Sequence, residues 1–274
     1  MTPAQAASSE YDAKIKRAEK LIAEKSSASE LLSFYRRIAG FQKDLLTKIA
    51  AAPTGEIPAF GSVRDGLDLT LLLPHFRTFL AIVEQNAPNA LAAAARELAV
   101  LPADSWVTLL TEYWEHGGRA GEEIGAFEQF FSRAFLQPFA AYVAGRTAVP
   151  PVLTTPRACP LCEGQPLLGV LRVEGDGGKR FLVCSFCGYE WGFQRILCPT
   201  CGEVEESKLP VYVAEQFPHI RVEACDTCKF CIRTIDLTKD GYAVPVVDDL
   251  AAIPLTLWAQ EHGYRRLQAN LLGS

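Results

Sequence analysis

Apolar residues recur every three or four positions through much of the first 150 residues. One such stripe runs from residue 31 to 49 and a second from 124 to 142. This spacing places side chains on one face of a helix, so each stripe predicts an amphipathic helix whose apolar face lies in a core. We therefore predict an all-helical domain over residues 1–150. The two stripes consist of Leu31, Phe34, Ile38, Phe41, Leu45, Ile49 and of Ile124, Phe127, Phe131, Phe135, Phe139, Tyr142.

Capping residues and helix breakers indicate where these helices begin and end. Ser27 and Glu30 form a capping-box signature before the first stripe, and Asp104 is a candidate cap for a later helix. A loop is expected at 52–67, which contains two prolines and three glycines. Pro138 should kink or break the helix that carries the second stripe. Helices are expected at 68–86, 88–100, 104–116 and 120–144.

The pattern changes to short alternating runs after a Gly, Thr and Pro-containing linker at 145–158. Leu167–Val173 and Lys179–Val183 flank Gly-Asp-Gly-Gly, which predicts a hairpin. A second hairpin is expected from Leu209–Ala214 and His219–Glu223. A helix over Ile253–Leu272 should follow. We expect domain boundaries at 151–195 for a first unit, 196–240 for a second unit and 241–274 for a C-terminal helical segment.

Four Cys-x-x-Cys pairs lie in this second half, separated by 21, 10 and 23 residues. Two residues between cysteines let a tight turn direct both sulfurs to one point, and two such turns supply four thiolates. All-sulfur tetrahedral coordination selects zinc or iron over magnesium and calcium. The spacing therefore predicts two four-cysteine metal sites, one in each unit. The predicted ligands are Cys159, Cys162, Cys184, Cys187 and Cys198, Cys201, Cys225, Cys228.

Alternative cysteine assignments also fit the spacing. The pairs 184/187 and 198/201 could share one site across the ten-residue gap. Cys231 extends the last pair to Cys-x-x-Cys-x-x-Cys; we assign 225/228 as the ligands and Cys231 as a packing thiol. A disulfide framework is disfavoured by the odd count of nine cysteines in a large chain without a signal segment. Two short hairpins bury little apolar surface, so we expect metal binding to supply the folding energy.

Composition bounds the class of protein. The chain of 274 residues is 49% apolar with a net charge of −5, which argues against general attraction to nucleic acid or anionic membranes. Residues 1–25 are polar and charged, and no run of eighteen apolar residues follows. We therefore expect a cytoplasmic protein without membrane insertion.

Motifs of catalysis are not found in the sequence. No Ser/His/Asp set, phosphate loop or dinucleotide fingerprint can be identified. The four histidines, His75, His116, His219 and His262, do not lie at metal-ligand intervals from one another. Closed four-thiolate sites leave no position for a substrate, so a non-enzymatic protein is expected.

The cysteine motifs and their flanking residues resemble the formate dehydrogenase accessory protein family called FdhE. The similarity runs from Cys159-Pro160-x-Cys162 through Cys184-Ser185-x-Cys187 and Glu190-Trp191 to Cys198-Pro199-x-Cys201-Gly202. It continues over Cys225-Asp226-x-Cys228, Asp248-Asp249-Leu250 and Trp258-Ala259-x-Glu261-x-Gly263-Tyr264. It is strong over 159–274 and loose over the helical half. Glycine after Cys162 is missing, and Cys231 is additional.

The resemblance implies a cytoplasmic maturation factor that binds the catalytic subunit of a molybdenum- or tungsten-dependent formate dehydrogenase. It also implies rubredoxin-like sites with two metal ions; the family suggests iron, and zinc suits the ligands equally. A homodimer is compatible with the sequence. The expected fold is α+β, an N-terminal helical bundle followed by tandem rubredoxin-like or zinc-ribbon-like units and a C-terminal helix.

Two functions from other classes remain. A rubredoxin-like electron carrier or redox protein would use iron or dithiol exchange. A zinc-ribbon nucleic-acid binder should carry a basic stripe, yet residues 157–233 hold nine Lys/Arg against ten Asp/Glu. Each thiolate site with a divalent metal adds about −2 to that balance.

Overall fold

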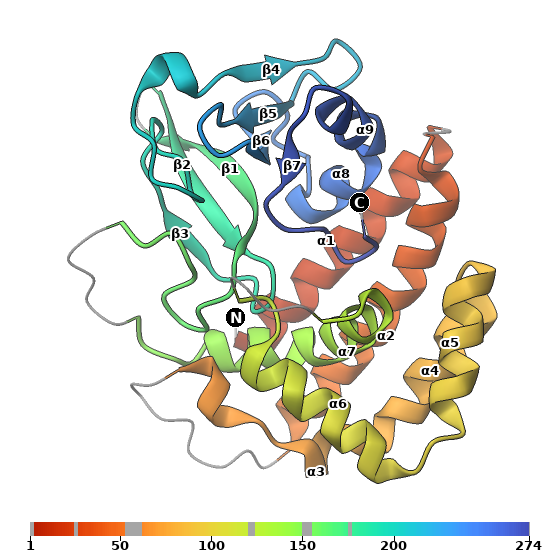
Figure 1. Cartoon of the computed structure of the whole chain (residues 1–274). Coiled ribbons are helices and arrows are strands. Elements are labelled where there is room, and N and C mark those ends of the chain that lie inside the picture. Colours follow the sequence, from red (N-terminus) through yellow and green to blue (C-terminus); the bar gives the residue numbers. More distant parts are fainter. Residues whose placement is uncertain are drawn as a thin grey trace.

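The computed structural model describes residues 3–24, 27–52, 62–119, 124–149, 155–174 and 177–273, and shows a helical half followed by one mixed β-sheet (Figure 1). The predicted α+β fold class is confirmed. Most of the predicted loop at 52–67 and part of the linker at 145–158 lie outside the described residues. The elements of the helical half are α1 (Pro3–Ala23), α2 (Ser29–Ala51), η1 (Val63–Gly66), α3 (Leu69–Leu72), η2 (Leu73–His75), α4 (Phe76–Asn86), α5 (Asn89–Ala99), α6 (Ala103–His116) and α7 (Ala126–Ala144).

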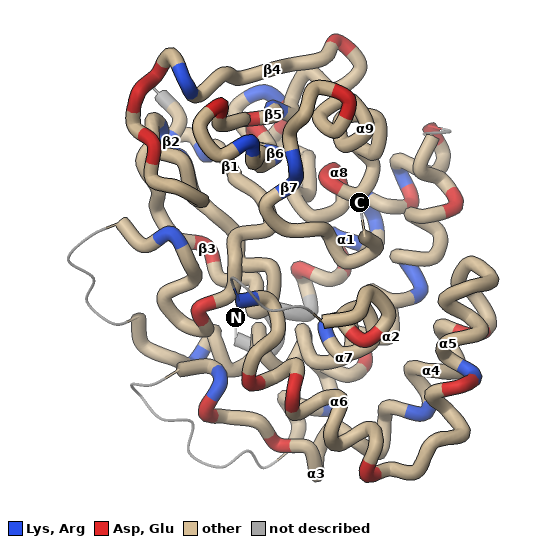
Figure 2. The backbone as a smooth tube through the Cα atoms, in the orientation of Figure 1, with Lys and Arg blue, Asp and Glu red and all other residues tan. Residues whose placement is uncertain are grey.

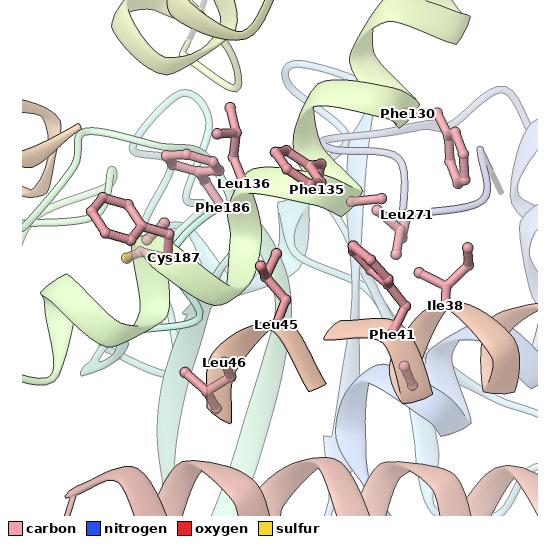
Figure 3. Packing of buried hydrophobic residues seen from close by; sticks show 14 of the residues in the cluster. Ile38, Phe41, Leu45, Leu46, Phe130, Phe135, Leu136, Phe186, Cys187 and Leu271 are labelled. Atoms are coloured by element: carbon pink, nitrogen blue, oxygen red, sulfur yellow. The ribbon is translucent and has the colours of Figure 1, made fainter. Parts of the chain in front are cut away.

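The two apolar stripes lie in α2 and α7 and largely form the core, as predicted. In α2 the stripe residues from Phe34 to Ile49 are buried. Phe41 contacts Phe135 of α7 with ring centroids 6.2 Å apart (Figure 3). Phe127 departs from the prediction, because it lies in the first turn of α7 and is 43% exposed. Pro138 lies inside α7 without ending it.

The predicted helix caps were wrong. Helix α2 begins after Ala28, which makes no side-chain cap hydrogen bond, so Ser27 does not cap it. Helix α6 begins after Pro102, and Asp104 lies in its first turn. A capping box does occur at η1, where Ser62 and Asp65 bond reciprocally. These two residues were not singled out in the sequence because the helix they cap is a single turn.

The strands form one seven-stranded sheet with the order β3-β2-β1-β6-β5-β4, and β7 pairs with β6. The predicted hairpins are β1/β2 and β4/β5, both antiparallel. The predicted turn at 175–176 lies outside the described residues. The strands are β1 (Pro166–Glu174), β2 (Gly177–Cys184), β3 (Glu190–Gly192), β4 (Val211–Val213), β5 (Ile220–Ala224), β6 (Phe230–Asp236) and β7 (Arg265–Arg266).

The two cysteine units are not independent hairpins, because β1 pairs in parallel with β6. This pairing joins the first unit to the second and lets the sheet bury both faces. Leu182 and Ile232 belong to the same buried cluster as residues of α2, α6 and α7. The expectation that the cysteine units bury little apolar surface was therefore wrong, because the sheet shares a large apolar core with the helices. The contribution of metal to the folding energy stays a prediction. The division into domains at 151, 196 and 241 stays a prediction.

The C-terminal segment contains two short helices, α8 (Pro245–Ala251) and α9 (Ile253–Glu261). The predicted helix over 253–272 was thus too long. Gly263 has φ +79°, a conformation that ends the helix at low cost only for glycine, and β7 follows it. Helix α8 contacts α1 and α2 as well as β1 and β6, so it connects the two halves.

Candidate metal centres

The four Cys-x-x-Cys pairs adopt one common turn. In three of them the N–H of the fifth residue donates to the carbonyl oxygen of the first cysteine, at 2.8–3.0 Å. In all four, the N–H of the first cysteine donates to the carbonyl oxygen of the sixth residue, at 2.9 Å. This geometry places both sulfurs of a pair on the same side of the turn.

The residue after the second cysteine has positive φ in all four turns. Glycine occupies this position at Gly188 and Gly202, with φ of +72° and +83°. Glu163 and Lys229 occupy it in the other two turns, with φ of +60° and +61°. The absence of glycine therefore does not change the turn geometry; the strained backbone is retained with a non-glycine residue.

The first site brings together Cys159, Cys162, Cys184 and Cys187. The sulfurs of 159 and 187 are 3.6 Å apart, those of 162 and 184 are 3.4 Å apart, and those of 162 and 187 are 3.6 Å apart. All four cysteines are buried. One pair comes from the turn before β1 and the other from the turn that follows β2.

The second site brings together Cys198, Cys201, Cys225 and Cys228. The sulfurs of 198 and 228 are 3.7 Å apart and those of 201 and 225 are 3.6 Å apart. Cys201 is exposed and Cys228 is half-buried, so this site reaches the surface. The second pair lies between β5 and β6.

Both groups fit a tetrahedral metal ion. A metal–sulfur distance of about 2.3 Å requires sulfur atoms about 3.8 Å apart, close to the separations above. All nine cysteines have free thiols, so the structure contains no disulfide between them. The groups also exclude the alternative pairing of 184/187 with 198/201, because these pairs lie in different groups. Two four-cysteine sites that could each bind a metal ion are thus present.

The thiols of the first group differ in the direction of their pKa shifts. Contacts from Cys159, Cys184 and Cys187 lower the pKa of Cys162 well below its usual value. Burial raises the pKa of the Cys184 thiol well above its usual value. A dication bound to the four sulfurs would favour the deprotonated form of each thiol.

Arg64 of η1 holds one turn of the first site against the helices. Its Nε donates to the Cys162 carbonyl oxygen at 3.1 Å, and its Nη2 donates to the Gly117 carbonyl oxygen at 2.6 Å. Its guanidinium also lies 4.4 Å from the centre of the Phe186 ring. Arg64 thus connects both turns of the site with the end of α6. No motif in the sequence indicated this role.

Arg133 and Gln137 of α7 hold the other turn. Both side chains donate to the carbonyl oxygen of Ser185, at 3.0 and 3.2 Å. Phe186 follows and packs edge-on against Tyr113 and Trp114, with ring centroids 5.5 and 5.3 Å apart. Figure 3 shows Phe186 and Cys187 among the buried side chains of the helical core.

The second site is held mainly by residues near it in sequence. Thr227 Oγ1 donates to Glu203 Oε2 at 2.6 Å, which joins its two turns. The N–H of Asp226 donates to the Lys208 carbonyl oxygen at 2.9 Å. Arg157 Nη1 donates to the Thr200 carbonyl oxygen at 2.9 Å. The turns of the two sites thus have the same backbone geometry and different neighbours.

Cys231 lies in β6, outside both groups. It is buried in the apolar cluster between the sheet and α9 together with Val222 and Leu255. Burial raises the pKa of its thiol. Its position agrees with the predicted packing role.

A third group of ligand-type atoms contains His219, Asp240 and Asp248. Arg17 of α1 already bridges the two carboxylates, because its Nη2 lies 2.5 Å from Asp248 Oδ1 and 3.0 Å from Asp240 Oδ2. His219 Nε2 lies 2.9 Å from Asp248 Oδ1. A guanidinium thus occupies the place of a cation, and this group is an ion-pair network. In the described residues, the other three histidines belong to no such group.

Several basic residues around the cysteine units are paired with acidic ones. Arg180 bonds Glu223 at 2.6 Å, and Lys229 bonds Asp226 at 2.6 Å. Figure 2 shows Lys and Arg interspersed with Asp and Glu over this half of the molecule. Separately, no helix among the described residues is long and apolar enough to cross a membrane.

Two family models match the second half of the chain. Residues 158–195 match the model described as FdhE, central domain, and residues 196–272 match FdhE, C-terminal domain. The boundary between the two models lies between Arg195 and Ile196, so each match contains one four-cysteine group.

Curated relatives are similar over longer and shorter stretches. The FdhE homolog of Aquifex aeolicus is 30% identical over 207 residues, which cover 75% of this chain and 71% of the relative. The FdhE homologs of Pseudomonas aeruginosa and Haemophilus influenzae strain PittGG are 35% and 32% identical, and those alignments cover 38% and 37% of the relatives.

The crystal structure of the FdhE protein from Pseudomonas aeruginosa has a similar fold. The TM-score is 0.65 at 24% identity, over 96% of this chain and 95% of the other. The fold similarity therefore includes the helical half, which neither family model covers.

Proposed function

The chain belongs to the FdhE family, and from this premise we propose that it is a cytoplasmic, non-enzymatic accessory factor that binds the catalytic subunit of a molybdenum- or tungsten-dependent formate dehydrogenase during maturation. The observation that carries the proposal is the pair of closed four-sulfur groups in an FdhE chain. Four thiolates complete a tetrahedral coordination sphere and leave no position for a substrate.

We further propose that the eight cysteines of these groups are metal ligands, with iron or zinc as the ion. A bound ion would hold together the two Cys-x-x-Cys turns of its site and supply folding energy. An iron ion could additionally exchange an electron. The residues of this chain would supply the rest: the four turns present the sulfurs, and the helical half covers the first site.

Co-purification tests the proposal. Tagged protein is expressed with the dehydrogenase, and the eluate is assayed for its catalytic subunit and for metal. Wild type should capture the subunit and retain metal. Cys184→Ser and Cys225→Ser should lose metal from one site each and weaken capture. Cys231→Ser is the matched control, since this buried cysteine lies outside both groups. Metal-loaded wild type that never captures the subunit would contradict the accessory role.

An electron carrier is a second candidate, favoured by the exposure of Cys201 at the second site. An iron ion there would lie close enough to the surface for electron exchange. The iron-loaded protein should then show a visible spectrum that bleaches and returns through reduction and oxidation. A zinc-loaded protein as isolated from cells, colourless throughout, would exclude this candidate.

A further inference from the structure

The two four-cysteine sites differ sharply in burial. At the first site the four cysteines are between 0% and 2% exposed. At the second site Cys198 and Cys225 are equally buried, whereas Cys201 is exposed and Cys228 is half-buried. A competing ligand can therefore approach a sulfur of the second site directly, and it can reach the first only after the surrounding structure opens.

The third residue of each Cys-x-x-Cys motif accounts for this difference. At the first site this residue is Leu161 or Phe186, which are 1% and 0% exposed. At the second site it is threonine in both turns: Thr200 is half-buried and Thr227 is exposed. The apolar residues anchor the first site in the helical core, whereas the threonines leave the second site at the surface.

The backbone contacts of the first site connect it to the helical half through both turns. Besides the bonds from Arg64, Arg133 and Gln137, the N–H of Val63 donates to the Leu161 carbonyl oxygen at 2.8 Å. The N–H of Gln165 donates to the Gly118 carbonyl oxygen at 2.8 Å. Releasing a ligand of this site requires these bonds to break together with the packing of Phe186.

Nearby charges also favour retention of a metal ion at the first site over the second. A dication with four thiolates carries about −2, a charge that is costly to bury unless cations lie nearby. Arg133 supplies buried positive charge and Arg64 half-buried positive charge beside the first site, and the side chains of both interact electrostatically with its cysteines. Lys208 and Lys229, near the second site, have side chains 48% and 55% exposed, so water shares their charge.

We propose that the first site is a permanent structural site that joins the helical half to the sheet, and that the second is an exchange site from which a soft divalent metal ion can leave and to which it can return while the rest of the molecule stays folded. This inference rests on the proposed metal ligation. The ligand class of the exchange site is a thiophilic cation such as zinc, delivered or removed by a competing chelator or thiolate.

Release of zinc from the full-length protein tests the inference. The protein is loaded with zinc alone and mixed with an excess of a chromogenic chelator, and zinc transfer is followed by absorbance. Two phases of about one zinc ion each are expected, with rates that differ by at least about tenfold. Cys201→Ser should abolish the fast phase and leave the slow one. Phe186→Thr gives the first site the residue found at the second, and should accelerate the slow phase toward the fast one.

Hydrogen exchange of wild type supplies a readout that needs no variant to fold. After the fast phase, amide exchange should increase at residues 198–203 and 225–230 and stay unchanged at 113–118 and 159–165. Release of both ions at one rate would overturn the exchange proposal while leaving the metal ligands in place. Loss of the slow phase in Cys201→Ser, or increased exchange at 113–118 during the fast phase, would also overturn it. Failure of wild type to bind zinc or iron at all would instead refute the proposed ligation.

Discussion

Glu163 and Lys229 have backbone conformations that glycine adopts without strain. Their side chains contribute exposed ion pairs, with Arg119 at 2.9 Å and with Asp226 at 2.6 Å, and such pairs stabilise a fold only weakly. A left-handed conformation costs a non-glycine residue about 1–2 kcal/mol. The two turns thus form despite this local cost.

Replacing Glu163 and Lys229 tests the cost of their left-handed backbone conformation. Glu163→Gly and Lys229→Gly should each raise the free energy of unfolding of the metal-loaded protein by up to about 1 kcal/mol, because relief of strain exceeds the added entropy of the unfolded chain. Gly188→Ala should lower it by about 1 kcal/mol, since a Cβ there meets no atom within 4 Å and only strain changes. Urea denaturation measures all three. If Gly188→Ala leaves the free energy of unfolding unchanged, a residue with a Cβ is tolerated at this position without cost.

Asp249 is the most completely buried acid of the junction between the halves. Its oxygens accept hydrogen bonds from Arg233 at 2.8 Å and from Arg266 at 2.7 Å. Asp249→Asn would leave the buried Arg233 without its counter-charge, so the free energy of unfolding should fall by about 3–5 kcal/mol. Glu190→Gln, which breaks the exposed pair with Arg172, should cost less than about 1 kcal/mol. Equal losses in the two variants would contradict this account.

The Asp249 carboxylate should also make the free energy of unfolding depend on pH. Burial raises the pKa of Asp249, but the charges of Arg233 and Arg266 outweigh burial, so its pKa lies below the usual value. Its contribution is therefore present above the unfolded pKa of about 3.9 and is lost as the pH falls through the lower folded pKa. The stability difference between wild type and Asp249→Asn should thus be constant at neutral pH and shrink below about pH 4. A difference that persists unchanged at pH 3 would exclude this ionic origin.

At the scale of elements, the parallel pairing of β1 with β6 determines whether the two cysteine units form one body. Gly169 faces Thr234 across this pairing, and a Cβ added at Gly169 would lie 2.3 Å from Thr234 Oγ1. Glycine fits here because the Thr234 side chain occupies the space that a Cβ would take, so a larger residue would have to displace that side chain.

Gly169→Ala should therefore lower the free energy of unfolding by about 1–3 kcal/mol through overpacking. Gly192→Ala in β3 is the matched control, because a Cβ there meets only Lys179 Cε at 3.9 Å. Thermal denaturation followed by circular dichroism compares the two. If both substitutions have the same effect, the clash with the Thr234 side chain is not the cause.

Sequence periodicity predicted most of these elements because their apolar faces are regular. The stripe from Phe34 to Ile49 and the hairpin strands were found where side chains alternate or repeat with the element. The β1–β6 pairing was missed, since parallel pairing between segments about 60 residues apart has no local pattern. The eight clustered cysteines were identified by spacing alone. Arg64, Arg133 and Phe186 were not, because contacts between the turns and the helices depend on the tertiary fold.

At the scale of the whole molecule, the first four-cysteine site lies at the junction between the halves. Its turns contact α6, α7 and η1, although none of its ligands comes from a helix. Metal loss there should consequently destabilise helices that contain no cysteine. The contacts given for the second site come instead from the sheet half, such as the hydrogen bond that the Tyr264 hydroxyl donates to Asp226 Oδ1 at 2.9 Å.

Removal of metal from the wild-type protein tests whether the helices depend on the first site and not on the second. Complete chelation should lower the midpoint of the helical circular dichroism transition by at least about 10 °C, because structural ions contribute several kcal/mol and each kcal/mol shifts the midpoint by about 2–4 °C. Brief chelation that removes only the fast-exchanging ion should leave that midpoint within about 2 °C of wild type. A shift of equal size after both treatments would mean that the helices do not depend on the first site.

The ion pair between Arg17 and Asp248 connects residues 231 positions apart. A ribosome synthesises α1 long before it reaches Asp248, so the Arg17 guanidinium faces solvent or nascent chain throughout most of translation. The helical half, with Arg64 and Arg133, also exists before Cys159 emerges. During synthesis, the four cysteines of the first site can thus come together before α1 pairs with α8.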